Sequence, residues 1–486
     1  MFLGIDLGTS GVKVVLVDGD QHVVDQETVP LSVQRPHPLW SEQDPEDWWR
    51  AADQAVVALK ARQARVLTGV RGIGLSGQMH GATLLDDADR PIRPAILWND
   101  GRAGAECAQL ERREPRSRTI TGNLAMPGFT APKLLWVAAH EPDAFARTRR
   151  VLLPKDYLRL RMTGVAASEM SDAAGTLWLD VAARRWSDAM LTATGLPLSA
   201  MPELFEGSQP TGTLRPEIAA AWGVPADAVV AGGAGDNAAG AAGVGVIRPG
   251  DAFLSLGTSG VLFVADAGYA PNPAQAVHAF CHCLPGTWHR MSVILSAASA
   301  LSWLARLLGG TEAELVAEAE RADADTGDLL FLPYLSGERT PHNDPAATGV
   351  FVGLTHATER PHLVRAVLEG VAFAFADGQA ALTAAGTEIG EVAVIGGGAR
   401  SRFWGRILAA ALNRPLHYPA GGELGPAFGA ARLGRLAATG EAPEAVCTRP
   451  QTSHVVEPDA ALAERYAEKH RRFRALYPML QPAWAG

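Results

Sequence analysis

The hexapeptide Leu-Gly-Thr-Ser-Gly-Val stands at residues 7–12 and again at residues 256–261 of this 486-residue chain. Short apolar runs flank both copies, at residues 2–5 and 14–17 and at residues 252–254 and 262–264. The pattern predicts a strand, a tight turn and a second strand in each half of the chain. Glycine lets the backbone approach an anion closely, and turn N–H and hydroxyl groups donate to phosphate oxygens. Two such turns suit one polyphosphate held from both sides, which predicts a two-lobed ATP-binding enzyme.

The alternative for either copy alone is ordinary hairpin chemistry, since glycine and serine are common in turns. Recurrence of six identical residues in the same apolar context favours the phosphate-binding interpretation. The copies differ in the residue before the leucine, which is Asp6 in the first and Ser255 in the second. Only the first turn therefore carries a carboxylate that can reach a magnesium ion or its waters.

Composition limits the function classes. The chain is 47% apolar and 20% charged, with a net charge of −9, which fits a globular protein of two or more domains and disfavours nucleic-acid or membrane-surface binding. Four cysteines without disulfide spacing, and no apolar leader or membrane span, predict a cytoplasmic protein. A metal site at His278, Cys281, His282 and Cys283 is disfavoured, because alternate strand residues point to opposite faces.

Strand and helix patterns alternate along the chain, which predicts α/β layering. Helices are expected over residues 44–60 and 362–382, and strands over 70–75 and 392–395. An Arg-Pro-Gly turn at 248–250 precedes the second hairpin. We therefore expect an N-terminal lobe over residues 1–245 and a C-terminal lobe over residues 246–486.

Asp236 is the candidate catalytic base. It follows a predicted buried strand and a glycine turn, and it precedes an alanine-rich helix. The simpler interpretation is that Asp236 or Asn237 only caps this helix. Phosphoryl transfer to an alcohol, however, needs a group that accepts the hydroxyl proton during in-line attack, and an ionised carboxylate suits that task.

Three further segments supply candidate binding residues. Residues 396–398 are three glycines after an apolar strand, and with Ala399 they allow a flat base or ribose to lie against the backbone. Residues 78–80 and 98–102 each follow a predicted strand, where open α/β sheets bind ligands. Gln78, Met79, His80 and Trp98 offer the amide, imidazole and aromatic groups that a sugar needs. Trp98 and His80 taken singly are equally compatible with core positions.

Together these motifs resemble the FGGY family of carbohydrate kinases, within the superfamily of actin, hexokinase and the heat-shock ATPases. The resemblance rests on residues 5–10, 256–259 and 396–399, on a C-terminal signature at 349–354 and 366–369, and on an N-terminal signature at 128–136 that departs at Ala139. It implies two lobes, each with a ribonuclease-H-like (actin-like) mixed sheet flanked by helices, and an active site in the cleft between them.

The resemblance also implies roles for individual residues. ATP would contact a first group of residues, Mg²⁺ would sit near Asp6 and Asp236 and bind them through water, and the sugar would contact a second group. The first group is Gly8, Thr9, Ser10, Lys13, Gly257, Thr258, Ser259, Gly397, Gly398 and Ala399. The second is Gln78, Met79, His80, Trp98, Asp236 and Asn237.

Within the family, residues 76–81, 97–102, 235–240 and 333–341 most resemble those of members that phosphorylate D-xylulose. Glycerol kinases typically carry Arg-Glu where this chain has Met79-His80, which disfavours a triol. D-Xylulose phosphorylated at its 5-hydroxyl is therefore expected. The alternatives are another ketopentose or polyol, or an actin-like or chaperone-type ATPase. A homodimer is suggested, and the roles of Glu338, Arg339 and His342 stay open.

Overall fold

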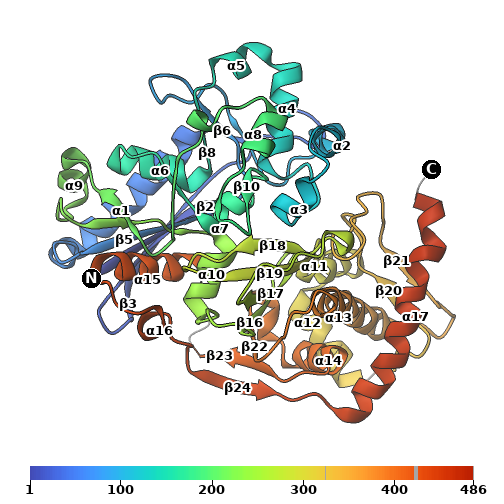
Figure 1. The fold of residues 1–486 in the computed structure, drawn as a ribbon. Coiled ribbons are helices and arrows are strands. Elements are labelled where there is room, and N and C mark those ends of the chain that lie inside the picture. The colour runs from blue at the N-terminus through green and yellow to red at the C-terminus, as the bar shows by residue number, and fades with distance from the viewer. Residues whose placement is uncertain (323–324, 421–424, 485–486) are drawn as a thin grey trace.

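The computed structural model describes residues 1–322, 325–420 and 425–484. Two mixed β-sheets, each flanked by helices, form two lobes (Figure 1). The expected α/β fold with two actin-like lobes is confirmed.

The first sheet has its centre at β1 and runs in the order β13-β14-β5-β1-β2-β3, with β15 also paired to β5. Its strands are β1 (Phe2–Leu7), β2 (Gly11–Val17), β3 (Val23–Pro30), β5 (Gly72–Gly77), β13 (Pro210–Thr213), β14 (Val229–Ala231) and β15 (Ala234–Gly235). β1 is antiparallel to β2 and parallel to β5.

The second sheet repeats this plan around β16, in the order β18-β19-β17-β16-β22-β23-β24. Its strands are β16 (Ala252–Leu256), β17 (Gly260–Asp266), β18 (His278–Cys281), β19 (Trp288–Ile294), β22 (Val392–Ile395), β23 (Leu416–Pro419) and β24 (Thr452–Val456). β16 is antiparallel to β17 and parallel to β22, as β1 is to β2 and β5. The repeated hexapeptide thus occupies the same topological position in both sheets.

Helices cover the sheets of both lobes. The first half contributes α1 (Pro45–Leu67), α2 (Gly104–Arg113), α3 (Ser117–Thr121), α4 (Thr130–His140), α5 (Pro142–Arg147), α6 (Pro154–Thr163), α7 (Met170–Ala174), α8 (Asp188–Thr194), α9 (Pro216–Trp222) and α10 (Asp236–Val244). The second half contributes α11 (Ala298–Leu308), α12 (Glu312–Ala322), α13 (Arg360–Ala384), α14 (Arg402–Leu412), α15 (Pro426–Thr439), α16 (Pro443–Val446) and α17 (Ala460–Trp484).

The predicted elements compare closely with these bounds. The strand expected at 392–395 coincides with β22, and the helix expected at 362–382 lies within α13. α1 starts where predicted, because the Asp44 carboxylate accepts from the Glu46 N–H at its N-terminus, but it continues to Leu67. The strand expected at 70–75 begins and ends two residues later, as β5.

α15 joins the two halves in space. Although it lies late in the chain, it packs on the first sheet, beside α10 (Figure 1). The approach is backbone against backbone, since a Cβ added to Gly74 of β5 would lie 1.7 Å from the Ala430 carbonyl oxygen. Small residues on both sides therefore let α15 sit at the junction of the lobes.

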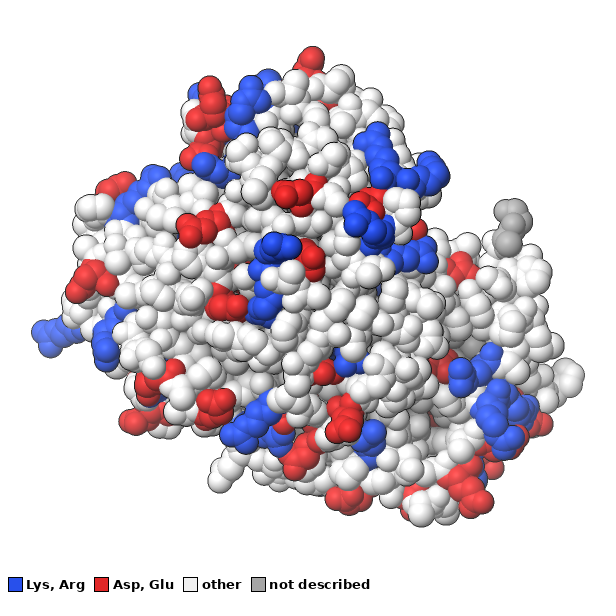
Figure 2. Space-filling view, in the orientation of Figure 1, with Lys and Arg blue, Asp and Glu red and all other residues white. Residues whose placement is uncertain are grey.

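The charge distribution on the surface bears on nucleic-acid binding, and the composition of the helices bears on membrane insertion. Figure 2 shows acidic and basic side chains interspersed over this face, without a basic stripe of the kind that nucleic-acid binding requires. Among the described residues, none of the helices combines the length and the apolar composition needed to cross a membrane.

Candidate active site

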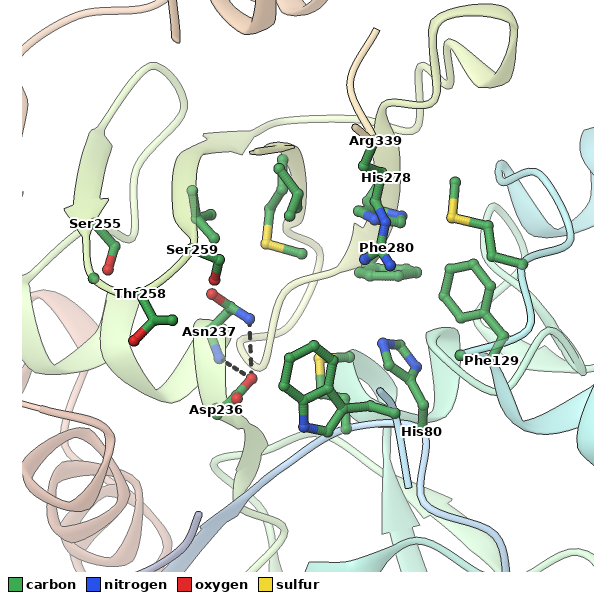
Figure 3. Close-up of a pocket in the computed structure, with 18 residues that line it drawn as sticks. His80, Phe129, Asp236, Asn237, Ser255, Thr258, Ser259, His278, Phe280 and Arg339 are labelled. Carbon is green, nitrogen blue, oxygen red and sulfur yellow. Dashed lines mark hydrogen bonds between the residues drawn. The ribbon is translucent and has the colours of Figure 1, made fainter. Parts of the chain in front are cut away.

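The candidate active site is a cavity of about 260 Å³ between the lobes. Its walls are Met79, His80, Trp98, Met126, Gly128, Phe129, Asp236 and Asn237 from the first half and Ser255, Gly257, Thr258, Ser259, Val261, His278, Phe280, Met291, Val293 and Arg339 from the second (Figure 3). The cavity therefore brings together Met79, His80, Trp98, Asp236 and Asn237, five of the six predicted sugar-binding residues.

Strand register places the two candidate acids close together. Asp6 of β1 pairs with Ser76 of β5, and Ser76 pairs in turn with Ala234 of β15. Asp236 follows two residues after Ala234, as the first residue of α10. Both carboxylates thus lie at the carboxyl end of the sheet, where parallel strands present ligand-binding groups.

Asp236 lies in the first turn of α10 without capping it, since the N-cap is Gly235. Its Oδ1 accepts from the Asn237 backbone N–H at 2.7 Å and from Asn237 Nδ2 at 2.9 Å (Figure 3). These bonds leave Oδ2 for a bound hydroxyl. Burial, followed by the nearby Asp6 charge, raises the pKa of Asp236 to about 7, against the opposing effect of the Asn237 donors.

Asp6 is a second perturbed acid in the cleft. Burial raises its pKa to about 6, although the Ser76 hydroxyl and Lys13 act in the opposite direction. Its Oδ1 is buried and has no hydrogen-bond partner among the residues that the structure describes. Two raised carboxylic pKa values in one cleft fit a divalent cation, because positive charge between the acids would favour both ionised forms.

His80 reaches the cavity through an unusual backbone conformation. Its φ is 69°, in the left-handed region, and its carbonyl oxygen accepts from Thr130 Oγ1 at 3.1 Å and from Lys133 Nζ at 2.9 Å. Its ring Nδ1 lies 2.7 Å from the Gly175 carbonyl oxygen, and a Cβ on Gly175 would lie 2.5 Å from the ring. Burial lowers the pKa of His80 to about 3, with Lys133 adding to the effect. The imidazole is therefore neutral and carries its proton on Nδ1.

Gln78 points elsewhere. Its Nε2 donates to Gln43 Oε1 at 2.9 Å, and its Oε1 accepts from Thr9 Oγ1 at 3.1 Å. Trp98 Nε1 also donates to Thr9 Oγ1, at 2.9 Å. Gln78 is thus part of a network that fixes the first turn and the Trp98 ring, and it does not line the cavity.

The second turn borders a larger groove, of about 890 Å³, which shares Gly257 and Thr258 with the sugar-sized cavity. Its apolar walls come from α11, α12 and α14, and Gly397 and Gly398 line it as well. The Ser401 hydroxyl accepts from the Trp404 N–H and fixes the start of α14 just after the glycines. Size, apolar walls and the adjoining turn suit a nucleotide.

Some predicted nucleotide contacts lie outside both cavities. Ala399 packs against the core of the second lobe. Gly8, Thr9, Ser10 and Lys13 line neither cavity, although they stand on the hairpin that carries Asp6. The first turn is held internally, since the Gly8 N–H donates to the Gly11 carbonyl and the Ser10 carbonyl accepts from Leu31.

The sequence analysis did not predict most of the apolar residues of the cavity wall, and it assigned no role to Arg339. Met126, Phe129, Phe280 and Met291 form much of the wall, and Arg339 is its only guanidinium among the described lining residues. His278 and Phe280 alternate on β18 and face the cavity together, a period-two signal that the sequence contained. His342, by contrast, stacks on Tyr477 with 3.5 Å between ring centroids.

Among the histidines and cysteines near 278–283, the adjacent His282 and Cys283 contact each other, with 3.5 Å between Nδ1 and Sγ. Cys281 Sγ contacts the Val181 carbonyl, and His282 Nε2 contacts the Val246 carbonyl. No group of potential metal ligands was found there or elsewhere among the residues with described positions.

Comparisons with known proteins agree with this geometry. The chain is 56% identical to a xylulose kinase of Escherichia coli, with 100% of both chains covered. The "xyloylose kinase" of Brucella ovis is 55% identical, with a TM-score of 0.97 and 99% of each chain covered. A xylulose kinase of Rhodospirillum rubrum is 33% identical, with a TM-score of 0.92 over 100% of both chains.

Two domain matches span most of the chain. Residues 1–243 match the N-terminal domain of the FGGY family of carbohydrate kinases, and residues 252–438 match its C-terminal domain. With the twin hairpins, the cleft and the whole-length relatives, these matches identify the chain as a carbohydrate kinase that belongs to the FGGY family.

Proposed function

We propose that this enzyme transfers the γ-phosphoryl group of ATP to the 5-hydroxyl of D-xylulose, giving D-xylulose 5-phosphate and ADP. One observation carries the proposal: Asp236 lies in the wall of a sugar-sized cavity that adjoins a nucleotide-sized groove at Gly257 and Thr258. The xylulose kinases that match the whole chain support the choice of substrate.

Asp236 acts as the general base. It accepts the proton of the 5-hydroxyl as that oxygen attacks the γ-phosphorus in line. The backbone donors of residues 257–259 hold the phosphates, while the neutral His80 and the Met79 side chain position the sugar. Gln78 supports the sugar site indirectly, by orienting Trp98 through Thr9.

Asp6 and Asp236 would hold Mg²⁺, in part through water. The bound ion would offset the charge of the phosphates and keep both carboxylates ionised. The unpartnered Oδ1 of Asp6 and the raised pKa values of both acids support this assignment.

The two lobes supply different parts of the active site. Residues 1–245 supply the base and much of the sugar site, and residues 246–486 supply the nucleotide groove, with α15 returning to the first sheet. Closure of the lobes would exclude water and limit ATP hydrolysis.

The four cysteines are free thiols, which suits a protein in the reducing cytoplasm. From the family resemblance we also propose that the enzyme is a homodimer.

The test is an ADP-release assay over D-xylulose, L-xylulose, D- and L-ribulose, xylitol and glycerol, with the phosphate position assigned by NMR. D-Xylulose should give the highest kcat/KM, with phosphate on O5. A preference for any other substrate, or sugar-independent ATP turnover at the same rate, would overturn the proposal.

The role of Asp236 is tested by Asp236→Asn. Loss of the base should lower kcat by roughly 10²- to 10⁴-fold, while ATP still binds and the thermal unfolding curve stays cooperative. Asp227→Asn, an exposed acid on the same stretch of chain, is the matched control and should keep wild-type kcat. Near-normal turnover by Asp236→Asn would remove this residue from the mechanism.

A further inference from the structure

Arg339 is a charged residue of the cavity wall to which the proposed reaction gives no function. It belongs to the segment between β20 (Leu330–Leu332) and β21 (Val350–Val352), which is anchored to β19. The Thr340 N–H donates to the Val293 carbonyl at 3.0 Å, and the Val293 N–H donates to Thr340 Oγ1 at 3.1 Å. These bonds hold Arg339 at the cavity wall.

The Arg339 guanidinium makes no ion pair within the described part of the chain. The neighbouring Glu338 carboxylate accepts instead from two backbone N–H groups, those of Leu295 at 3.0 Å and of Arg339 itself at 2.7 Å. Burial, only partly offset by Glu338, lowers the pKa of Arg339. Arg339 is half-buried at the cavity wall, so its N–H groups can donate to a ligand that enters the cavity.

Figure 3 shows that different side chains lie at the two ends of the cavity. Ser255, Thr258 and Ser259 lie beside Asp236 at one end, toward the nucleotide groove. Arg339, His278, Phe280 and His80 lie at the other end. A sugar with its 5-hydroxyl at Asp236 therefore extends its C1–C2 end toward Arg339.

Both histidines at this far end present hydrogen-bond acceptors. His80 donates through Nδ1 to the Gly175 carbonyl, so that its Nε2 accepts. The Nδ1 of His278 lies 3.3 Å from Asn123 Oδ1, and Asn123 Oδ1 is an acceptor because Asn123 Nδ2 already donates to the Thr121 and Ala279 carbonyls. The Nε2 of His278 therefore accepts as well, which suits hydroxyl groups of a sugar.

The other N–H donors of the cavity side chains are committed or, like the second N–H of Asn237 Nδ2, lie beside Asp236 at the near end. Trp98 Nε1 donates to Thr9, and Asn237 Nδ2 donates to Asp236. Among the described residues lining the cavity, Arg339 is thus the side chain that brings free N–H donors to the far end.

The chemistry of the substrate requires such a donor. A 2-ketopentose closes its furanose ring by adding the 5-hydroxyl to C2, so a molecule that offers a free 5-hydroxyl is open-chain and carries a ketone at C2. A ketone oxygen accepts hydrogen bonds and donates none, which neither acceptor imidazole can satisfy.

We propose that Arg339 donates to the C2 carbonyl oxygen of the open-chain ketose and thereby sets the preference for a 2-ketose over the corresponding polyol. This inference rests on the proposed function. Asp236 then binds the end of the sugar that is phosphorylated, and Arg339 binds the end that carries the ketone.

The experiment compares three substrates in Arg339→Met and Arg339→Lys. These are D-xylulose, 1-deoxy-D-xylulose, which keeps the ketone without the C1 hydroxyl, and xylitol, which has an alcohol at C2. Arg339→Met should lower kcat/KM for both ketones by about 10- to 100-fold and for xylitol by less than about 3-fold. Arg339→Lys retains one charged donor and should recover part of the loss for the ketones alone.

His342→Phe is the matched control, because His342 lies three residues further on and stacks on Tyr477 outside the cavity; it should leave the ketose-to-polyol ratio unchanged. Unchanged ATP binding and thermal unfolding show that each variant is folded. Equal losses for all three substrates, no loss at all, or a loss for D-xylulose but not for its 1-deoxy analogue would overturn the assignment. If the wild-type enzyme does not phosphorylate D-xylulose, the proposed function fails instead, which the wild-type assay reports separately.

Discussion

The β1–β2 turn and the β16–β17 turn have the same six-residue sequence and the same place in equivalent sheets, yet their surroundings differ. In the first, the Thr9 hydroxyl bonds with Gln78 and Trp98, on the sugar side. In the second, the Thr258 carbonyl accepts from the Ala297 N–H at the start of α11, and Thr258 lines both cavities. An identical turn thus supports the proposed sugar site in one lobe and borders both the proposed sugar site and the proposed nucleotide site in the other.

The preceding residue adds a second difference. Asp6 is a half-buried carboxylate whose buried Oδ1 has no hydrogen-bond partner among the described residues, whereas Ser255 is a neutral hydroxyl in the cavity wall. Of the two residues that precede the turns, only Asp6 thus brings a charge to the cleft. The comparison teaches that a repeated motif fixes backbone geometry, and that neighbouring side chains fix its chemistry.

Separate substitutions of Asp6 and Ser255, the residues before the two turns, should differ most in their effect on kcat. Asp6→Asn removes the charge that would hold Mg²⁺ and should lower kcat by about 10²-fold or more. Ser255→Ala removes one neutral hydroxyl and should cost less than about 10-fold. Steady-state kinetics at saturating ATP and Mg²⁺ measure both. Comparable losses would show that the two turns contribute equally to charge stabilisation.

The two threonines should affect different substrates. Thr258→Val alters the residue shared by the two cavities and should raise KM for ATP by about 3- to 10-fold. Thr9→Val leaves Trp98 Nε1 and Gln78 without their partner, so it should raise KM for the sugar while KM for ATP changes little. Measuring both KM values in each variant tests the contrast. If both variants raise KM for ATP alike, the first turn contacts the phosphates as directly as the second.

The smallest expected effect is on stability. Because the pKa of Asp6 is raised to about 6 in the folded protein, the native state holds this proton more tightly than the unfolded chain does. Ionisation above pH 6 therefore costs stability, and the cost disappears below the unfolded value of about 4. Without nucleotide or metal, Asp6→Asn should raise Tm by ~2–5 °C at pH 8 and much less at pH 4.

Ser255→Ala is the control for this stability effect, since it removes no charge and should change Tm by the same amount at both pH values. Differential scanning calorimetry supplies the measurement. A lower Tm for Asp6→Asn at pH 8 would mean that the Asp6 carboxylate stabilises the empty cleft.

The amino-acid sequence by itself determined the duplicated strand–turn–strand units, the α/β class, the family and the placement of Asp236 at a strand end. The family rests on the resemblance of whole motifs, and the others follow from local signals: apolar runs, glycine turns and helix starts that lie within a few residues of one another. β22 and α13 were predictable for the same reason.

Tertiary structure decided which further side chains face the cleft and which predicted ones do not. The apolar wall combines Phe129, Phe280 and Met291 from three distant segments, and α15 reaches the first sheet only because glycines such as Gly74 meet it there. Gln78 turned toward Thr9, and Arg339 turned into the cavity, through hydrogen bonds to partners far along the chain. Side-chain direction depends on such long-range contacts, which no local pattern encodes.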